Sequence, residues 1–130
     1  MASIFSRIVS GEIPAWKITE NEEFLAFFDV FPIAKGHALV VPKQEIDYIF
    51  DMDDALLSRM HLFAKKVANA MKPVFPCVKI GIAVIGLEVP HAHIHLVPMN
   101  GIQDMNFQNP RLKFSDEEYK AMIDSVQKHL

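Results

Sequence analysis

The chain has 130 residues, 51% of them hydrophobic, and this length suits a single domain over residues 1–130 with a substantial core. Its formal net charge of −3 predicts no broad basic surface, so we expect no long nucleic acid as a partner, although a mononucleotide is compatible with it. The single cysteine excludes an internal disulfide framework, and no apolar run or signal-peptide pattern predicts a membrane partner, so we expect a cytoplasmic protein.

The N-terminal segment predicts a short helix from about Ser3 to Val9, which Gly11 ends. The apolar side chains of Ile4, Phe5 and Ile8 share one face of this helix. Packing of that face into the core is the simplest expectation.

Three strands are expected in the N-terminal half. Residues 16–19 and 24–30 form the first two, because a polar turn separates two apolar runs. The second run ends at Asp29, a residue type that commonly caps or turns the chain. Residues 38–42 are continuously apolar, as in the interior of a sheet, and His37 stands directly before them.

A long amphipathic helix is expected next. It begins near Asp51 or Asp53, where acidic side chains suit the positive end of the helix dipole, and two prolines end it. Its apolar stripe comprises Leu56, Met60, Phe63, Val67 and Met71. The strongly apolar residues 78–85 then predict a strand, which Gly86 turns toward the following segment.

Histidines occupy every second position of the next segment. His91, His93 and His95 lie between two prolines, which argue against a helix. Strict alternation is typical of a strand, because successive side chains point to opposite faces. We therefore expect a strand with three imidazoles on one face, and with an apolar row beneath them formed by Ala92, Ile94 and Leu96.

The histidine row has three possible explanations. A chance surface patch is disfavoured, because exact alternation beside an apolar row is rare. A metal site is the second: neighbouring histidines of the row would lie about 6.6 Å apart and can share one ion, whereas the outer two, about 13 Å apart, cannot readily do so. Acid–base or nucleophilic chemistry on an anionic substrate is the third, since imidazole is a nucleophile near neutral pH and imidazolium binds anions. We favour the third.

The C-terminal part predicts an irregular loop over residues 99–113 and a final helix to about Lys128. Ser115 and Glu118 have the spacing of a capping box at the start of this helix. The order of elements predicts an α+β fold, with an antiparallel sheet of about five strands, two main helices and the short N-terminal helix.

Residues 91–97, His-Ala-His-Ile-His-Leu-Val, resemble the His-φ-His-φ-His-φ-φ signature of the histidine-triad (HIT) nucleotide hydrolases and transferases. Residues 11–14, 25–30 and 32–43 resemble the N-terminal half of that family in order and spacing. The resemblance covers roughly residues 3–99 and is greatest to the small, Hint-like branch. It implies a single HIT-like domain and a homodimer in which two sheets join.

The resemblance also implies roles for individual residues. His93 would be the nucleophile, and His95 would hydrogen-bond the phosphate of the substrate. His91 would fix the tautomers of its neighbours, and His37 would lie behind the triad and orient it. Contacts with the substrate are implied for Phe5, Ile8, Phe27, Asp29, Val30, Glu88 and Val89, with the Asp29 carboxylate accepting hydrogen bonds from the ribose hydroxyls.

Two segments depart from the family pattern. Many relatives carry Cys-x-x-Cys, part of a structural zinc site, where this chain has Ser3 and Ser6. Hydroxyls are poor zinc ligands, so we expect no such site. Residues 83–88 are apolar and short, whereas relatives have a polar amide and a longer Gly-rich loop. This difference removes donors to the phosphate or to the leaving group.

The expected function is hydrolysis of purine nucleoside 5′-phosphate derivatives, of the phosphoramidate or dinucleotide type, through a covalent nucleotidyl-histidine. The expected scheme needs no metal or other cofactor, and the expected partners are the purine nucleotide or its conjugate and a second copy of the chain. Two alternatives stay open. One is a metal-dependent hydrolase that uses the His-x-His strand, and the other is a non-catalytic nucleotide-binding or scaffold protein.

Overall fold

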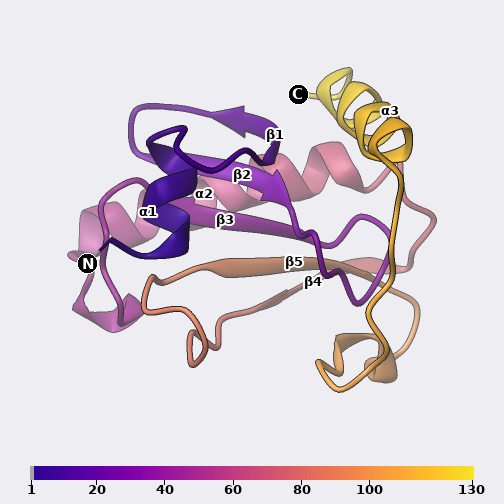
Figure 1. Cartoon of the computed structure of the whole chain (residues 1–130). Coiled ribbons are helices and arrows are strands. Elements are labelled where there is room, and N and C mark those ends of the chain that lie inside the picture. Colours follow the sequence, from indigo (N-terminus) through magenta and orange to yellow (C-terminus); the bar gives the residue numbers. More distant parts are fainter. Residues whose placement is uncertain (1) are drawn as a thin grey trace.

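The computed structural model describes residues 2–130 and has five strands and three α-helices in this range (Figure 1). The strands are β1 (Trp16–Glu20), β2 (Phe24–Phe28), β3 (Ala38–Pro42), β4 (Lys79–Ala83) and β5 (Ile94–Met99). The α-helices are α1 (Ile4–Val9), α2 (Asp54–Met71) and α3 (Asp116–Gln127), and the short 3-10 helices are η1 (Ile49–Asp51) and η2 (Ile102–Met105). Within residues 2–130, no helix is both long and apolar enough to cross a membrane.

The strands form one antiparallel sheet in the order β1-β2-β3-β5-β4. Short polar turns connect β1 to β2, whereas α2 lies in the long connection between β3 and β4. This architecture confirms the predicted α+β fold with a five-stranded antiparallel sheet. The central strands β2 and β3 are buried at every position, so both faces of the sheet are covered there.

Helix α2 covers one face of the sheet. Asp53 caps its N-terminus by accepting a hydrogen bond from the Leu56 backbone, and the helix ends at Met71, before the two prolines. Its buried side chains are Leu56, Met60, Ala64, Val67, Ala70 and Met71, so the predicted stripe is present, although Phe63 is only partly buried. Helix α3 has the predicted capping box and packs on β1, where Tyr119 stacks on Trp16 with the ring planes 4° apart.

Helix α1 covers the opposite face of the sheet (Figure 1). Phe5 and Ile8 of α1 pack against alternate residues of the two central strands, which are Leu25, Phe27, Leu39 and Val41. This second apolar cluster lies on the face of β5 that carries His95, because Leu39 pairs with His95 in the ladder between β3 and β5. The sheet therefore lies between two apolar clusters, one under α2 and one under α1. The second cluster holds α1 against the sheet.

The histidine segment enters the sheet later than the sequence predicts. Strand β5 begins at Ile94, so His91 and His93 precede the ladder. The backbone carbonyl of Pro42, at the end of β3, accepts a hydrogen bond from the ring of His91. The backbone N–H of Ala92 donates to the carbonyl of Ile46 at 2.7 Å. These two backbone groups therefore do not extend the ladder between β3 and β5. The alternation nonetheless holds, because Ala92, Ile94 and Leu96 belong to the core under α2.

Strand β4 is shorter than the sequence predicts, and it is partly exposed. It covers residues 79–83 instead of 78–85 and lies at the edge of the sheet. Its apolar side chains lack the cover that α1 and α2 give to the central strands, so Ile82 is 53% exposed. Apolar composition does not distinguish an interior strand from an edge strand, so the sequence alone did not place this strand in the sheet.

Candidate active site

Four histidines meet on the α1 face of the sheet. His91, His93 and His95 come from β5 and the segment before it, and His37 precedes β3. All four side chains are buried, with His93 and His95 retaining 6% and 8% exposure. The ring centroids of His93 and His95 are 4.8 Å apart, and those of His37 and His95 are 5.2 Å apart. The structure thus brings together the four residues for which catalytic roles were expected.

The ring of His91 is held by contacts at both nitrogens. Its Nε2 lies 2.8 Å from the carbonyl oxygen of Pro42, which can only accept, so Nε2 carries the proton. Nδ1 therefore accepts a hydrogen bond, and the Ser3 hydroxyl donates it at 2.7 Å. These contacts tie the histidine segment to the N-terminus of α1 on one side and to the end of β3 on the other.

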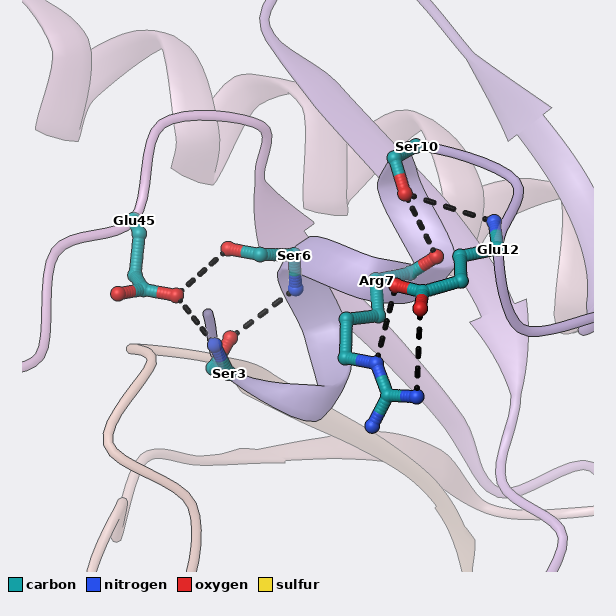
Figure 2. Close-up of polar contacts among 6 residues, drawn as sticks. All are labelled: Ser3, Ser6, Arg7, Ser10, Glu12 and Glu45. Atoms are coloured by element: carbon teal, nitrogen blue, oxygen red, sulfur yellow. Dashed lines mark hydrogen bonds and ion pairs between the residues drawn. The ribbon is translucent and has the colours of Figure 1, made fainter. Parts of the chain in front are cut away.

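Ser3 is itself held by Glu45 and Ser6 (Figure 2). The Ser3 backbone N–H and the Ser6 hydroxyl both donate to Oε1 of Glu45, at 2.6 Å and 2.7 Å. The Ser3 hydroxyl also caps α1 by accepting from the Ser6 backbone. These hydrogen bonds, first that from the Ser3 backbone, lower the pKa of Glu45 to about 2. Glu45 is therefore ionised at neutral pH, and its carboxylate holds Ser3, which donates to His91.

His93 donates through Nδ1 to the backbone carbonyl of His91 at 2.7 Å. Because a carbonyl can only accept, Nδ1 carries the proton and Nε2 keeps a free lone pair. Burial lowers the pKa of His93, so the ring is predominantly neutral at pH 7. A neutral imidazole with a free nitrogen is a nucleophile.

The protons of His37 and His95 are fixed in the same way. The backbone N–H of Ile33 donates to Nδ1 of His37 at 3.1 Å, so Nε2 of His37 carries the proton and donates to Nδ1 of His95 at 2.9 Å. His95 therefore carries its own proton on Nε2 and is a donor at that atom. Burial lowers the pKa of His37 to about 4 and that of His95 to about 3, which keeps both rings neutral.

Asp29 follows β2 and lies beside this pair. Its Oδ2 is 3.7 Å from Nε2 of His37, and its Oδ1 accepts from the Phe31 backbone at 2.8 Å. The Tyr119 hydroxyl donates to the Asp29 carbonyl, so α3 also holds this turn. One ligand atom each of Asp29, His37 and His95 lie within 4.8 Å of one another. A metal ion there would have to replace the hydrogen bond between the two imidazoles.

Two cavities meet at His93. The larger site cavity, of about 480 Å³, is lined by all seven residues for which substrate contacts were expected: Phe5, Ile8, Phe27, Asp29, Val30, Glu88 and Val89. The smaller site cavity, of about 320 Å³, lies beside His95 and includes Phe107 and Gln108. Glu88, His93 and Arg111 line both cavities. A molecule occupying both would therefore pass directly over His93.

The family model described as HIT domain matches residues 10–102 of this chain. The chain belongs to the HIT family. The adenosine 5′-monophosphoramidase of Schizosaccharomyces pombe is 32% identical to it over 128 residues, which cover 97% of this chain and 96% of the relative.

Solved HIT structures have the same fold. A Hit-like protein involved in cell-cycle regulation from Bartonella henselae is 26% identical, with a TM-score of 0.85 and coverage of 98% of this chain and 96% of that chain. A zinc-bound histidine triad family protein from Mycobacterium smegmatis is 27% identical, with a TM-score of 0.83 and coverage of 98% and 95%.

The residues around Ser3 in this HIT protein do not fit a structural zinc ion. The available groups are two hydroxyls, the Glu45 carboxylate and His91, and the set contains no thiolate. Nδ1 of His91 already accepts from Ser3. Structural zinc sites use cysteine and histidine. In this chain, hydrogen bonds rather than a metal hold Ser3, Glu45 and His91 together.

Three features of this HIT site were missed from the sequence. Arg111 lies in the segment that was expected to be only an irregular loop, and its position beside His93 depends on the tertiary fold. The partners of His91, which include Ser3 and Pro42, are 88 and 49 residues away from it in sequence. Glu45 has no sequence signal of its own, because it is a single carboxylate in a polar connection.

Proposed function

We propose that this chain hydrolyses nucleoside 5′-phosphate derivatives, such as purine nucleoside phosphoramidates or dinucleotides, through a covalent nucleotidyl intermediate on His93. The observation that carries the proposal is the arrangement of protons in the two rings beside the cavities. His93 offers a lone pair at Nε2, and His95 offers an N–H at Nε2. A nucleophile and a donor side by side are what displacement at phosphorus requires.

In the first step, Nε2 of His93 attacks the α-phosphorus and forms a P–N bond. The bond between phosphorus and the leaving amine breaks on the opposite side, and the amine takes a proton from solvent. The ring of His93 is cationic in the intermediate, and its Nδ1 keeps its proton and still donates it to the His91 carbonyl. His95 donates to a phosphoryl oxygen, where negative charge must be stabilised.

In the second step, water attacks the same phosphorus and the bond to His93 breaks. The water releases one proton, the nucleoside monophosphate leaves and the neutral ring of His93 is restored. Both steps are in-line displacements at a phosphorus held between the two cavities. Dividing the reaction in this way lets a positioned nitrogen, rather than water, perform the displacement of the amine.

The larger site cavity suits a nucleoside. Phe5, Phe27 and Val89 give it apolar walls that can stack on a purine base, and Asp29 offers a carboxylate for the ribose hydroxyls. The relative named adenosine 5′-monophosphoramidase supports an adenosine phosphoramidate as the first substrate to test. The smaller site cavity would then receive the leaving group.

The test is turnover of adenosine 5′-phosphoramidate by the parent and by His93→Ala. We expect the parent to release AMP and the variant to lose at least about 1,000-fold in kcat, as when a nucleophile is removed. His129→Ala is the matched control, since that histidine is exposed near the C-terminus. A parent that binds AMP but shows no turnover would contradict the proposal and favour a nucleotide-binding module.

The cluster of Asp29, His37 and His95 supports one competing function, a metal-dependent hydrolase. Its test is metal analysis of the purified protein together with turnover in the presence of a chelator. The covalent scheme predicts full activity after chelation. Stoichiometric metal with activity that a chelator abolishes would favour the metal-dependent scheme instead.

We also propose that the chain is a single HIT domain that acts as a cytoplasmic homodimer. The edge strand β4 and the residues after it expose Ile82, Ile85 and Leu87, and a cavity of about 620 Å³ beside them includes Tyr48 and Phe50. A second copy would cover these apolar side chains and pair the free edge. Light scattering of the parent and of Ile82→Lys tests this: we expect a dimer that the charge weakens, and a monomeric parent would contradict it.

A further inference from the structure

We propose that Arg111 is a cationic binding residue for the substrate's phosphate, beside the His95 donor, a role that rests on the proposed function and adds to it. Arg111 lies between η2 and α3, a segment far in sequence from the histidines. It lines both site cavities, and the two other residues that do so are His93 and Glu88. A phosphorus atom attacked by His93 would therefore lie beside the guanidinium.

The guanidinium is held in place by backbone carbonyls. One terminal nitrogen donates to the carbonyl of Phe31 at 2.9 Å, and the other donates to that of Phe107 at 3.2 Å. Its carbon lies 6.0 Å from the centre of the Phe107 ring. These contacts use two of the five N–H groups of an arginine, so three stay available to an anion.

The charges around the cavities favour such a cation. Asp29 and Glu88 are the acidic residues that line them, and burial keeps His93 and His95 neutral. A phosphate entering this region meets carboxylates and uncharged imidazoles. Among the described residues, Arg111 is the one lysine or arginine lining either cavity. It therefore supplies the positive charge that offsets the repulsion.

Arg111 also shares the smaller site cavity with the altered loop before the histidines. Residues 83–88 are Ala-Val-Ile-Gly-Leu-Glu, whereas the resemblance implies a polar amide and a longer Gly-rich loop there. The guanidinium approaches the same junction from the opposite segment, after β5, and offers N–H donors to phosphoryl oxygens. A charged donor on the C-terminal segment thus takes the place of donors that the shortened loop does not offer.

The alternative is that Arg111 is purely structural and only links the turn after β2 to the segment after η2 through its hydrogen bonds. The two roles predict different effects of substitution. A structural link depends on the hydrogen bonds to Phe31 and Phe107, so its loss would lower the Tm. An anion site depends on the positive charge, so Arg111→Lys retains part of the function and Arg111→Gln loses it.

The experiment is calorimetric titration of AMP into the parent, Arg111→Gln, Arg111→Lys and the control Lys113→Gln, with the Tm of each protein measured alongside. We expect Arg111→Gln to weaken AMP binding about 10- to 100-fold, the range for loss of a charged hydrogen-bond partner. Arg111→Lys should lose less, and Lys113→Gln, an exposed cation of the same segment, should match the parent.

Parent-like AMP affinity in Arg111→Gln would overturn the inference. Equal losses in both Arg111 variants, accompanied by equal falls in Tm, would also overturn it, because they indicate a structural link. The readout is binding of AMP and not its formation. A parent that binds AMP through Arg111 but does not hydrolyse the phosphoramidate would therefore contradict the proposed function alone.

Discussion

The Nδ1–H of His93 donates to the backbone carbonyl of His91 at 2.7 Å, so the main chain of one histidine fixes the tautomer of the next. The ring of His91 is in turn held by Ser3 and by the carbonyl of Pro42. The nitrogen of His93 that we propose as the nucleophile is thus positioned by a series of contacts that begins at the N-terminus of α1.

Ser3→Ala should reduce both stability and activity. It removes the N-cap of α1, which costs about 1 kcal/mol of unfolding free energy, and it also removes the donor to His91. We expect kcat to fall about 10-fold, because the ring that supports His93 loses one of its two anchors. Ser115→Ala is the matched control, since Ser115 caps α3 and has no histidine partner. Urea unfolding and steady-state kinetics of both variants separate the effects, and an equal kcat in the two would contradict the account.

Activity should be independent of pH above about 7 and fall in acid. The lone pair of His93 is available while the ring is neutral, and burial lowers its pKa from the ordinary value of 6.5. The midpoint of the decline in kcat/KM should therefore lie below pH 6.5. A pH–rate profile for adenosine 5′-phosphoramidate checks this. A midpoint above 6.5 would mean that the charged form of His93 is favoured by its surroundings, contrary to its burial.

Folding stability should also decrease in acid through His37. Burial lowers the pKa of its folded form from 6.5 to about 4, so the unfolded chain binds a proton more readily between these values. Its contribution is complete above pH 6.5 and is lost as the pH falls toward about 4. At about pH 5 the loss is of the order of 2 kcal/mol. Urea unfolding above pH 6.5 and at about pH 5 should show a smaller loss of unfolding free energy for His37→Asn than for the parent. Equal losses would contradict the lowered pKa of His37.

Gly36→Ala should be more damaging than Gly11→Ala. Both glycines have positive φ, of 93° and 85°, so each alanine incurs a backbone cost of about 1 kcal/mol. At Gly36 the added Cβ would also lie 2.7 Å from the ring of Phe75, whereas the space around Gly11 is open. We expect about 1–3 kcal/mol of additional loss in unfolding free energy and lower activity, since His37 follows Gly36 directly. Equal losses in the two variants would contradict the packing of Phe75 against this turn.

Asp29→Asn should reduce discrimination for the ribose. The amide retains an oxygen that can accept from the Phe31 backbone, but it loses the charge that favours two vicinal hydroxyls. We expect kcat/KM for the adenosine substrate to fall about 10-fold, while that for the 2′,3′-dideoxy analogue stays near its parent value. Asp104→Asn is the control, because Asp104 also accepts backbone hydrogen bonds in a turn but lines neither site cavity. Equal effects on both substrates would exclude a contact with the hydroxyls.

Sequence patterns predicted most of the fold because the relevant signals are local. The caps at Asp53 and Ser115, the apolar stripe of α2 and the alternation around His95 each depend on residues a few positions apart. The predicted start of β5 was wrong. It depends on the hydrogen bond between the His91 ring and the Pro42 carbonyl, which joins residues far apart in sequence.

The histidine row was recognisable as a candidate site from its spacing, and the resemblance suggested which residues line its cavities. The tautomers were not accessible in the same way. They depend on backbone groups such as the N–H of Ile33 and the carbonyl of His91. Arg111 was missed because an isolated arginine in an irregular segment has no periodicity, and folding alone places it beside His93.

The central claim is that His93 carries the nucleotide covalently during turnover. It is tested most directly by mixing the protein with adenosine 5′-phosphoramidate, quenching the reaction in alkali on the millisecond scale and locating the adduct by peptide mass spectrometry. We expect one adenylyl group on His93, formed at the rate of amine release and absent from His93→Ala. Full turnover with no adduct on His93, or with the adduct on another residue, would contradict it.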